Sequence, residues 1–352
     1  MNIRQLIPKP FDIRFYRMAL IALVTTVVTS SSLSASAATE KELGTLSLQF
    51  ENDLFSGTDQ NYTNGIRVSW LSPEGDTFRS LQVVREFLES IAQDENKSTR
   101  FGLSVGQDMY TPENRYRSDL IRNDRPYAGW LYGGMSLHTV TNYGHGRMDQ
   151  ESVEVNLGVI GPWSLAEQAQ NLVHEVRLID QFEGWDNQLH SEPGLLVQYE
   201  RKWRLFDPIV LGGTEFDAIP HAGVSLGNVM TQANGGGAIR WGWNLPKNFG
   251  PPSLIQGVSS LDRAPENTVS FYTFMAVQGR FVAHNLFLDG NTFQNSHRVD
   301  KKNWVGDASV GAALLLGRFK IAYTNAFRTR EFDGQDRISR FGSVSVSFQA
   351  AF

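Results

Sequence analysis

The fold is decided by two segments, Leu46-Ser-Leu-Gln-Phe-Glu-Asn-Asp-Leu-Phe55 and, after a short polar stretch, Asn61-Tyr-Thr-Asn-Gly-Ile-Arg-Val-Ser-Trp70. Apolar and polar side chains alternate in both segments, which is the period of a β-strand. Each predicted strand therefore has one apolar face and one polar face. This pattern indicates a wall between lipid and water, as in a transmembrane antiparallel β-barrel.

The first 38 residues have the features of a cleaved signal peptide. Basic residues at positions 4, 9, 14 and 17 precede an apolar core over 18–28, and Ala35-Ser36-Ala37 fits a cleavage site. This core is too short to cross a bilayer, which needs about 20 residues. We therefore expect residues 1–38 to be removed and residues 39–352 to form one outer-membrane barrel domain.

Charge and composition exclude several classes of protein. Removing four basic residues and one acid with the signal peptide changes the net charge from −5 to −8, which speaks against a nucleic-acid partner. There is no cysteine, so we expect a closed hydrogen-bonded scaffold to hold the exported chain. No later apolar run reaches the length of about 18 residues that predicts a membrane-spanning helix.

The end of the chain also alternates. In Val344-Ser-Val-Ser-Phe-Gln-Ala-Ala-Phe352 every second residue is apolar, as in the last strand of bacterial outer-membrane barrels. The alternative is the edge strand of a soluble sandwich, which would invite aggregation. With these three segments, about a dozen strands are predicted, an even number that suits a single-chain barrel. The others lie near residues 101–106, 127–140, 152–159, 194–206, 209–226, 237–244, 269–283, 284–294, 304–315 and 317–330.

Aromatic residues near the strand ends are expected to form girdles at the membrane surfaces. They are Trp70, Tyr127, Trp130, Trp203, Trp241, Trp243 and Tyr272.

One segment, near residues 164–180, departs from the strand pattern. Ser164-Leu-Ala-Glu167 matches a capping box, and apolar residues follow at helical spacing. We expect an inserted helix of about four turns on the loop or lumen side, where it plugs the barrel or carries a site. Gln170, Asn171 and His174 are neighbours on this helix because residues three and four apart share a face.

His174 is the leading candidate for a general base, because a neutral imidazole can take a proton from water near pH 7. The alternative is a solvated surface histidine. Asn52-Asp53 offers oxygen atoms suited to calcium, although from these residues alone an Asx-turn that caps the strand explains them better. Thr63 and Asn64 have the same turn alternative. We expect neither a nucleophile elbow of the Gly-x-Ser-x-Gly type nor a structural zinc site.

Four arginines, Arg115, Arg117, Arg122 and Arg125, lie between the third and fourth predicted strands. They form either an ordinary charged loop or a clamp for phosphates or acidic sugars, which the guanidinium fork suits.

Six motifs give the chain a family resemblance. They are Phe50-Glu-Asn-Asp-Leu-Phe55, Asn61-Tyr-Thr-Asn-Gly65, Gly106-Gln-Asp-Met-Tyr-Thr-Pro112, Asn123-Asp-Arg-Pro-Tyr-Ala-Gly129, Gly158-Val-Ile-Gly-Pro162 and Gln170-Asn-Leu-Val-His174. In this order they resemble the outer-membrane lipid A 3'-O-deacylase family (LpxR-like). The match covers most of the N-terminal half, whereas the C-terminal half matches mainly in its strand pattern.

The resemblance implies a barrel of about twelve strands and calcium-dependent hydrolysis of the ester that holds the 3'-linked acyloxyacyl group of lipid A. It implies His174 as the base and Gln170 as a helper on the helix. Asn52, Asp53 and Thr63 would form the group that binds calcium and steadies the oxyanion, with Asp53 and Thr63 as metal ligands.

Arg115, Arg117 and Asp180 remain candidates for substrate contacts. The chain departs from the family's pattern of basic residues in the arginine loop, and distant members of the family differ in the acyl position on which they act.

We therefore expect a monomeric, multi-pass β-barrel of the bacterial outer membrane that removes an acyl chain from lipid A in lipopolysaccharide. The ester would enter through an opening in the barrel wall near the first strands and the helix. Two alternatives stay open. The first is a non-catalytic barrel, acting as a channel or a surface-binding protein, and the second is a calcium-dependent outer-membrane phospholipase.

Overall fold

The structure, a computed structural model, describes residues 43–52, 61–74, 96–177, 180–250 and 269–351. The chain divides into two units, 1–40 and 41–352, and all described residues belong to the second. The predicted signal peptide, residues 1–38, lies outside the described residues, as does Asp53.

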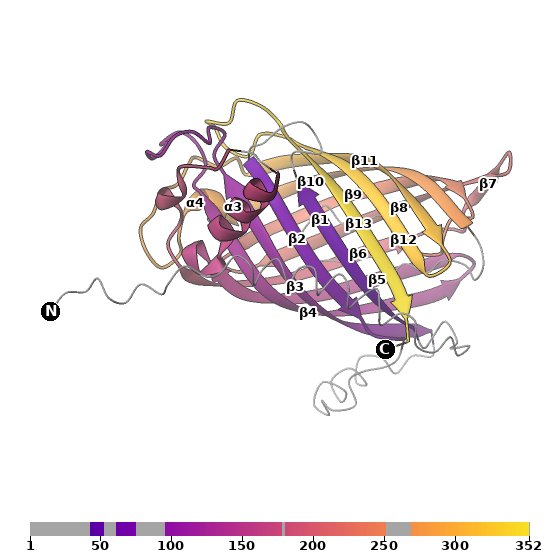
Figure 1. Cartoon of the computed structure of the whole chain (residues 1–352). Helices are drawn as coiled ribbons and strands as arrows, with labels where there is room; N and C mark the ends of the chain where they lie inside the picture. Colours follow the sequence, from indigo (N-terminus) through magenta and orange to yellow (C-terminus); the bar gives the residue numbers. More distant parts are fainter. Residues whose placement is uncertain (1–42, 53–60, 75–95, 178–179, 251–268, 352) are drawn as a thin grey trace. The chain divides into compact units, whose positions relative to one another are not determined.

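Twelve long antiparallel strands pair in a closed ring (Figure 1). Neighbouring strands in the ring are consecutive in the chain, β1 pairs with β13, and β6 pairs with β8. The predicted barrel is thereby confirmed. The strands are β1 (Gly44–Asn52), β2 (Asn61–Leu71), β3 (Lys97–Thr111), β4 (Ala128–Gly144), β5 (Arg147–Ile160), β6 (Glu192–Arg204), β8 (Thr214–Leu226), β9 (Met230–Trp243), β10 (Val269–Asn285), β11 (Trp304–Leu316), β12 (Phe319–Arg328) and β13 (Ser339–Ala350).

Two predicted strands differ from the structure. Residues 209–226 form a hairpin of β7 (Ile209–Leu211) and β8, because Gly212 and Gly213 both have positive φ and make a turn between them. Residues 284–294 were predicted as one strand. Instead, β10 ends at Asn285, whose side chain accepts a hydrogen bond from the backbone of Phe287 and starts the short helix α4 (Leu286–Asp289).

The alternation predicted for the first two strands is confirmed. Leu48 and Ile66 face outward and are exposed, whereas Arg67 and Ser69 face inward and are buried. Leu103 and Val105 continue the exposed apolar surface on β3. Among the described residues, no helix is both long and apolar enough to cross a membrane.

The aromatic girdle is only partly as predicted. Trp241 and Trp243 are exposed, and Trp70 and Trp203 are half-buried. Tyr127, Trp130 and Tyr272 are buried, so their assignment to the girdle was wrong. Trp130 and Tyr272 have the inward parity of their strands and pack inside the barrel with other apolar side chains.

An apolar cluster fills the inside of the barrel near the end where α3 and α4 lie, called here the helical end (Figure 1). Phe287 of α4 stacks on Tyr110 of β3, with ring centroids 4.2 Å apart. The same cluster contains Trp130 of β4 and, from across the ring, Phe341 of β13. Side chains from opposite walls thus meet in the lumen.

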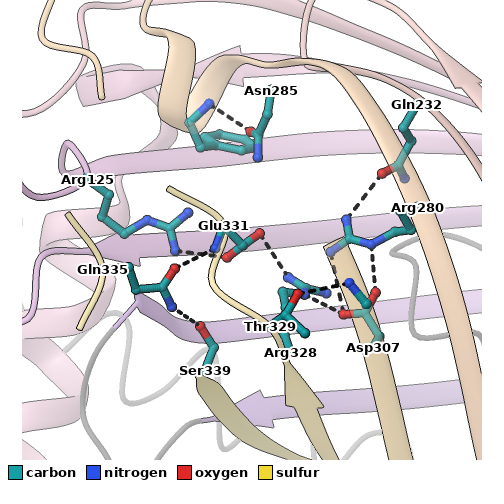
Figure 2. A network of polar contacts seen from close by, with 12 residues as sticks. Arg125, Gln232, Arg280, Asn285, Asp307, Arg328, Thr329, Glu331, Gln335 and Ser339 are labelled. Carbon is teal, nitrogen blue, oxygen red and sulfur yellow. Dashed lines mark hydrogen bonds and ion pairs between the residues drawn. The ribbon is translucent and has the colours of Figure 1, made fainter. Parts of the chain in front are cut away.

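A network of buried charges lies beside this cluster (Figure 2). The carboxylate of Asp307 accepts hydrogen bonds from Arg280 at 2.7 Å and from Arg328 at 2.6 Å. Glu331 lies 3.6 Å from Arg328 and 3.7 Å from Arg125. The lumen here holds paired charges from β10, β11, β12 and two connecting segments.

Candidate functional site

The inserted helix α3 (Ala166–Arg177) lies against the outer surface of the barrel wall. A Cβ atom on Gly129 of β4 would come within 2.2 Å of the Cβ of Ala166 and of the Oγ of Ser164. Gly129 has the outward parity of β4, because its neighbours Ala128 and Trp130 face the lumen cluster. Gln107, which faces outward on β3, donates a hydrogen bond to the carbonyl of Ser164 at 2.6 Å. The helix therefore lies in the loop that connects β5 and β6, as one expected alternative had it, and the other alternative, a helix that plugs the lumen, was wrong.

The start of α3 also differs from the predicted capping box. A 3₁₀ turn, η5 (Gly161–Ser164), precedes the helix, and the hydroxyl of Ser164 donates back to the carbonyl of Gly161 at 2.6 Å. Leu165 then adopts a left-handed φ of 57°, and its carbonyl accepts the backbone N–H of Ala169. The helix has 12 residues, slightly fewer than the four turns expected.

A second apolar cluster joins α3 to the wall. It contains Met109, Tyr127, Ala166, Phe182 and Trp185. The ring of Tyr127 lies 5.1 Å from Trp185 and 6.2 Å from Phe182, between centroids. Burial raises the pKa of Tyr127 to about 12, so its hydroxyl stays neutral. The segment after α3 is thus packed onto the outer wall.

A row of outward-facing positions leads from this cluster to the end of β1. Asn52 lies opposite Asn64, Asn64 opposite Met109, and Met109 opposite Gly129. Residues opposite each other on paired strands share a face. Asn52 and Asn64 are only 4% and 6% exposed, although their parity is that of the lipid-facing Leu48 and Ile66. Two buried amides therefore lie on the outer wall beside α3.

Thr63 occupies an irregular position in this row. The register between β2 and β3 shifts between Tyr62 and Asn64, so Thr63 is the extra residue of a bulge. Bulges re-aim side chains and are common beside active sites. The side chain of Thr63 lies outside the described part of the chain.

His174 is buried, with 4% of its surface exposed. Its Nδ1 lies 2.7 Å from the backbone carbonyl oxygen of Asp180, and its ring packs 5.5 Å from that of Phe182. A carbonyl only accepts hydrogen bonds, so Nδ1 carries the hydrogen and Nε2 of the neutral ring is an acceptor. Within the described part of the chain, Nε2 has no hydrogen-bond partner. The alternative of a solvated surface histidine does not hold.

Gln170 lies one turn before His174 and is also buried. Its Oε1 accepts a hydrogen bond of 2.7 Å from the indole nitrogen of Trp185, in the 3₁₀ turn η6 (Trp185–Asn187). Sequence reasoning missed Trp185. An aromatic residue after a helix gives no indication of its partner, because the contact depends on how the chain folds back.

Asp180 acts on His174 through its backbone, whereas its side chain accepts a hydrogen bond of 3.3 Å from the hydroxyl of Tyr116. Arg115 donates to the same hydroxyl at 3.0 Å. The structure therefore connects Arg115, Asp180 and His174 through one chain of contacts. Tyr116, the link, was also missed from the sequence.

The four arginines do not form one cluster. Arg117 pairs with Asp119 on the exposed surface. Arg125 is buried inside the barrel, where it pairs with Glu331 and lies over the ring of Tyr110 at 5.0 Å. Arg125 thus joins the luminal network and is not available as a phosphate clamp.

Of the expected calcium-binding group, Asn52 is described with its side chain, whereas Asp53 lies outside the described residues. Among the residues that the structure describes, no three histidine or acidic side chains gather as a metal site. The described part of the expected group is the buried amide of Asn52, beside that of Asn64. Amide, carboxylate and hydroxyl oxygens are the donors that calcium prefers, so the chemistry of the set fits this ion.

The pattern Gly-x-Ser-x-Gly does occur twice, at Gly102–Gly106 and Gly223–Gly227. Ser104 and Ser225 are buried within β3 and β8. A nucleophile elbow needs a sharp turn from a strand into a helix. Neither serine meets that requirement.

Solved structures of outer-membrane proteins are similar to this chain, and one of them supports its fold. The LpxR from Salmonella typhimurium superposes with a TM-score of 0.68 at 18% identity, covering 86% of this chain and 99% of that one. The β domain of the Bordetella autotransporter BrkA gives a TM-score of 0.47 at 8% identity, over 88% and 100% of the two chains. The translocator domain of NalP from Neisseria meningitidis gives 0.39 at 9% identity, over 95% and 97%.

A search of curated proteins finds no match. A family model described as outer membrane protein LpxR matches residues 20–350. The chain therefore belongs to the LpxR family of outer membrane proteins, as a multi-pass β-barrel of the outer membrane.

Proposed function

We propose that this protein is a calcium-dependent lipid A deacylase that hydrolyses the ester of the 3'-linked acyloxyacyl group. The proposal rests on the position of His174, a buried imidazole on the outer side of the barrel wall, whose Nδ1 is held by a carbonyl while Nε2 has no partner among the described residues. Family membership supports the same reaction class.

His174 acts as the general base. Its Nε2 accepts a proton from the water that attacks the ester carbonyl carbon, and later returns a proton to the leaving oxygen. The hydrogen bond from Nδ1 to the carbonyl of Asp180 fixes the ring and favours the tautomer that this role requires. No serine nucleophile is needed.

Asn52, Asp53 and Thr63 would hold the calcium ion at the ends of β1 and β2. Bound there, calcium would supply a positive charge beside the ester carbonyl oxygen. The amide of Asn52 lies at the end of β1 on an outward-facing position and offers an oxygen atom of the kind that calcium prefers, which supports this assignment.

Lipid reaches this site from the side. The ladders between β1 and β2, β2 and β3, and β3 and β4 run on to the helical end, so the expected opening through the wall does not occur between the described parts of these strands. An outward-facing site needs no such opening, because it borders the lipid-facing surface directly. Arg115 and Arg117 would contact the phosphates of lipid A from the loop that covers the site.

The channel alternative is disfavoured by the inside of the barrel. Tyr110, Trp130, Phe287 and Phe341, from opposite walls, meet in one buried cluster. A polar, water-filled lumen is the usual feature of a porin. The lumen of this barrel is filled with packed side chains near its helical end.

The test uses the purified full-length protein in detergent with lipid A as substrate. Mass spectrometry of the products should show loss of the acyloxyacyl group in calcium buffer, and no loss after EDTA until calcium is returned. Glycerophospholipid in place of lipid A should give no released fatty acid. Release from glycerophospholipid alone would support the phospholipase alternative, and no release from either substrate would contradict the proposal.

A further inference from the structure

The contact between Trp185 and Gln170 fixes the orientation of an amide beside the candidate base. An indole N–H can only donate, so the atom of Gln170 that faces it at 2.7 Å must be the amide oxygen. Amide oxygen and nitrogen are otherwise hard to distinguish. The Nε2 group of Gln170 therefore points away from Trp185.

This Nε2 group is buried and has no hydrogen-bond partner among the described residues. A buried donor without an acceptor destabilises a protein, and such groups in native structures call for an explanation. Gln170 lies one helical turn from His174, on the same buried face of α3. An acceptor brought by a ligand at His174 would satisfy it.

Trp185 contacts α3 through Ala166 and Gln170, and it is also anchored to the barrel wall. Its ring packs 5.1 Å from Tyr127, which immediately precedes β4. The carbonyl of Trp185 accepts the backbone N–H of Gln188, and Gln188 forms a β-bridge with Tyr127. Gln170 is thus oriented by a group that the barrel wall holds in place.

We propose that Trp185 is a positioning residue, which turns the amide of Gln170 so that its Nε2 donates to the ester carbonyl oxygen during hydrolysis. This inference rests on the proposed deacylase activity. As water attacks the carbonyl carbon, its proton passes to Nε2 of His174, and the electron pair of the C=O bond moves onto the oxygen that Gln170 faces. When the carbonyl re-forms, the ester C–O bond breaks and His174 returns the proton to the leaving oxygen.

A double-mutant cycle tests the coupling between the two residues. Loss of one oxyanion donor costs about 10²–10³-fold in kcat, so we expect that loss in Gln170→Leu and about a tenfold loss in Trp185→Phe, both with little change in KM. Because Trp185 acts through Gln170, the double variant should be no slower than Gln170→Leu alone. The control is Trp304→Phe, an exposed tryptophan of β11, which should keep wild-type kinetics.

A spectroscopic measurement separates positioning from mere packing. In protein labelled with ¹⁵N-tryptophan, the resonance missing from Trp185→Phe identifies the indole N–H of Trp185. It should move in Gln170→Leu. It should stay near its wild-type position in Gln170→Glu, which keeps an acceptor oxygen for Trp185 but loses the N–H donor and therefore kcat.

The outcomes distinguish the inference from the proposed function. A wild-type protein that releases no acyl chain contradicts the proposed function and with it the inference. If the wild type is active, three results contradict the inference alone. They are an unchanged kcat in Trp185→Phe, a loss of kcat in the double variant equal to the product of the two single losses, and an indole resonance that does not move in Gln170→Leu.

Discussion

The Asp307 network in the lumen and the outer wall beneath α3 both bury polar side chains, but these side chains are paired differently. Around Asp307 in the lumen, the carboxylate accepts hydrogen bonds from both Arg280 and Arg328, so these opposite charges satisfy one another (Figure 2). Elsewhere in the lumen, the buried guanidinium nitrogens of Arg125 and Arg204 have no hydrogen-bond partner among the described residues. On the outer wall, Gln170 and His174 each keep one ring or amide nitrogen without a partner among the described residues. The first arrangement stabilises a barrel, whereas the second leaves hydrogen-bonding capacity for a ligand.

The difference follows from what each region contacts. A charged group next to lipid is costly to bury, and neutral amide and imidazole groups cost less. Asn52, Asn64, Gln170 and His174 carry no permanent charge. Charged groups in the described part of the site, such as Arg115 and Asp180, lie in its exposed loops. Each prediction below changes one side of this comparison.

The largest effect is expected from replacing the proposed general base, His174. His174→Ala should lower kcat by about 10²–10⁴-fold, because water then has no positioned proton acceptor. The barrel should still fold, since the side chain lies outside it, as checked by the mobility shift of unheated protein in a denaturing gel. The matched control is His190→Ala, whose side chain is exposed. Equal activity of wild type and His174→Ala would assign the chemistry to another residue.

The luminal counterpart is Asp307→Ala, which leaves Arg280 and Arg328 buried without their shared carboxylate. Breaking a buried ion pair by removing one partner costs about 3–5 kcal/mol, so the free energy of unfolding in urea should fall by that amount. Activity per folded molecule should stay close to the wild-type value. Asp333→Ala removes an exposed ion pair with Lys302 and should leave unfolding unchanged. A stable but inactive Asp307→Ala protein would contradict the claim that the luminal network serves stability and the outer wall serves activity.

A smaller effect is expected from lifting α3 off the wall. Gly129→Val places carbon atoms where Ala166 and Ser164 already lie, so the helix must shift outward. A misplacement of about 1 Å can cost about 10²-fold in rate, and we expect a loss of kcat of at least about tenfold with the barrel intact. At Gly133, another outward position of β4, the nearest atom lies 3.9 Å away. Gly133→Val should therefore keep full activity. Equal rates for both variants would show that the position of α3 on the barrel wall does not affect catalysis.

The smallest effect is expected at Arg115, in the loop between β3 and β4. Arg115→Ala removes a charge and the hydrogen bond to Tyr116. Exposed charge contacts contribute about 1 kcal/mol or less, so KM for lipid A should rise by up to about fivefold while kcat stays constant. The control is Arg330→Ala, an exposed arginine of the connection between β12 and β13. A fall in kcat would instead connect Arg115 to His174, through Tyr116 and Asp180.

Strand alternation was enough to predict the barrel, and helical spacing was enough to place Gln170 and His174 on one face of one helix. The side of the wall that this helix covers was not predictable. Periodicity gives the apolar face of a helix, but both surfaces of the wall at this end are partly apolar. Gly129 leaves the room that Ala166 and Ser164 occupy, but Gly133 is an outward glycine of the same strand without such a neighbour, so the glycine alone does not reveal the contact.

The arginines show a second limit of sequence reasoning. Arg115 and Arg125 are close in the chain and look equivalent, yet one lies at the exposed rim and the other in the lumen. Glu331, the partner of Arg125, is brought near only when β13 closes on β1. Contacts that depend on ring closure have no local signature. The same holds for α4, whose apolar residues read as a strand until the lumen cluster is seen.

The most direct test of the account is the lipid A of living cells that produce wild-type protein, His174→Ala or Asp307→Ala. Mass spectrometry of extracted lipid A should show loss of the acyloxyacyl mass with wild type, and with Asp307→Ala in proportion to its folded amount. His174→Ala at equal abundance should leave lipid A intact. Unchanged lipid A in the wild-type cells, or deacylation that persists in His174→Ala, would contradict an outer-wall site that hydrolyses lipid A.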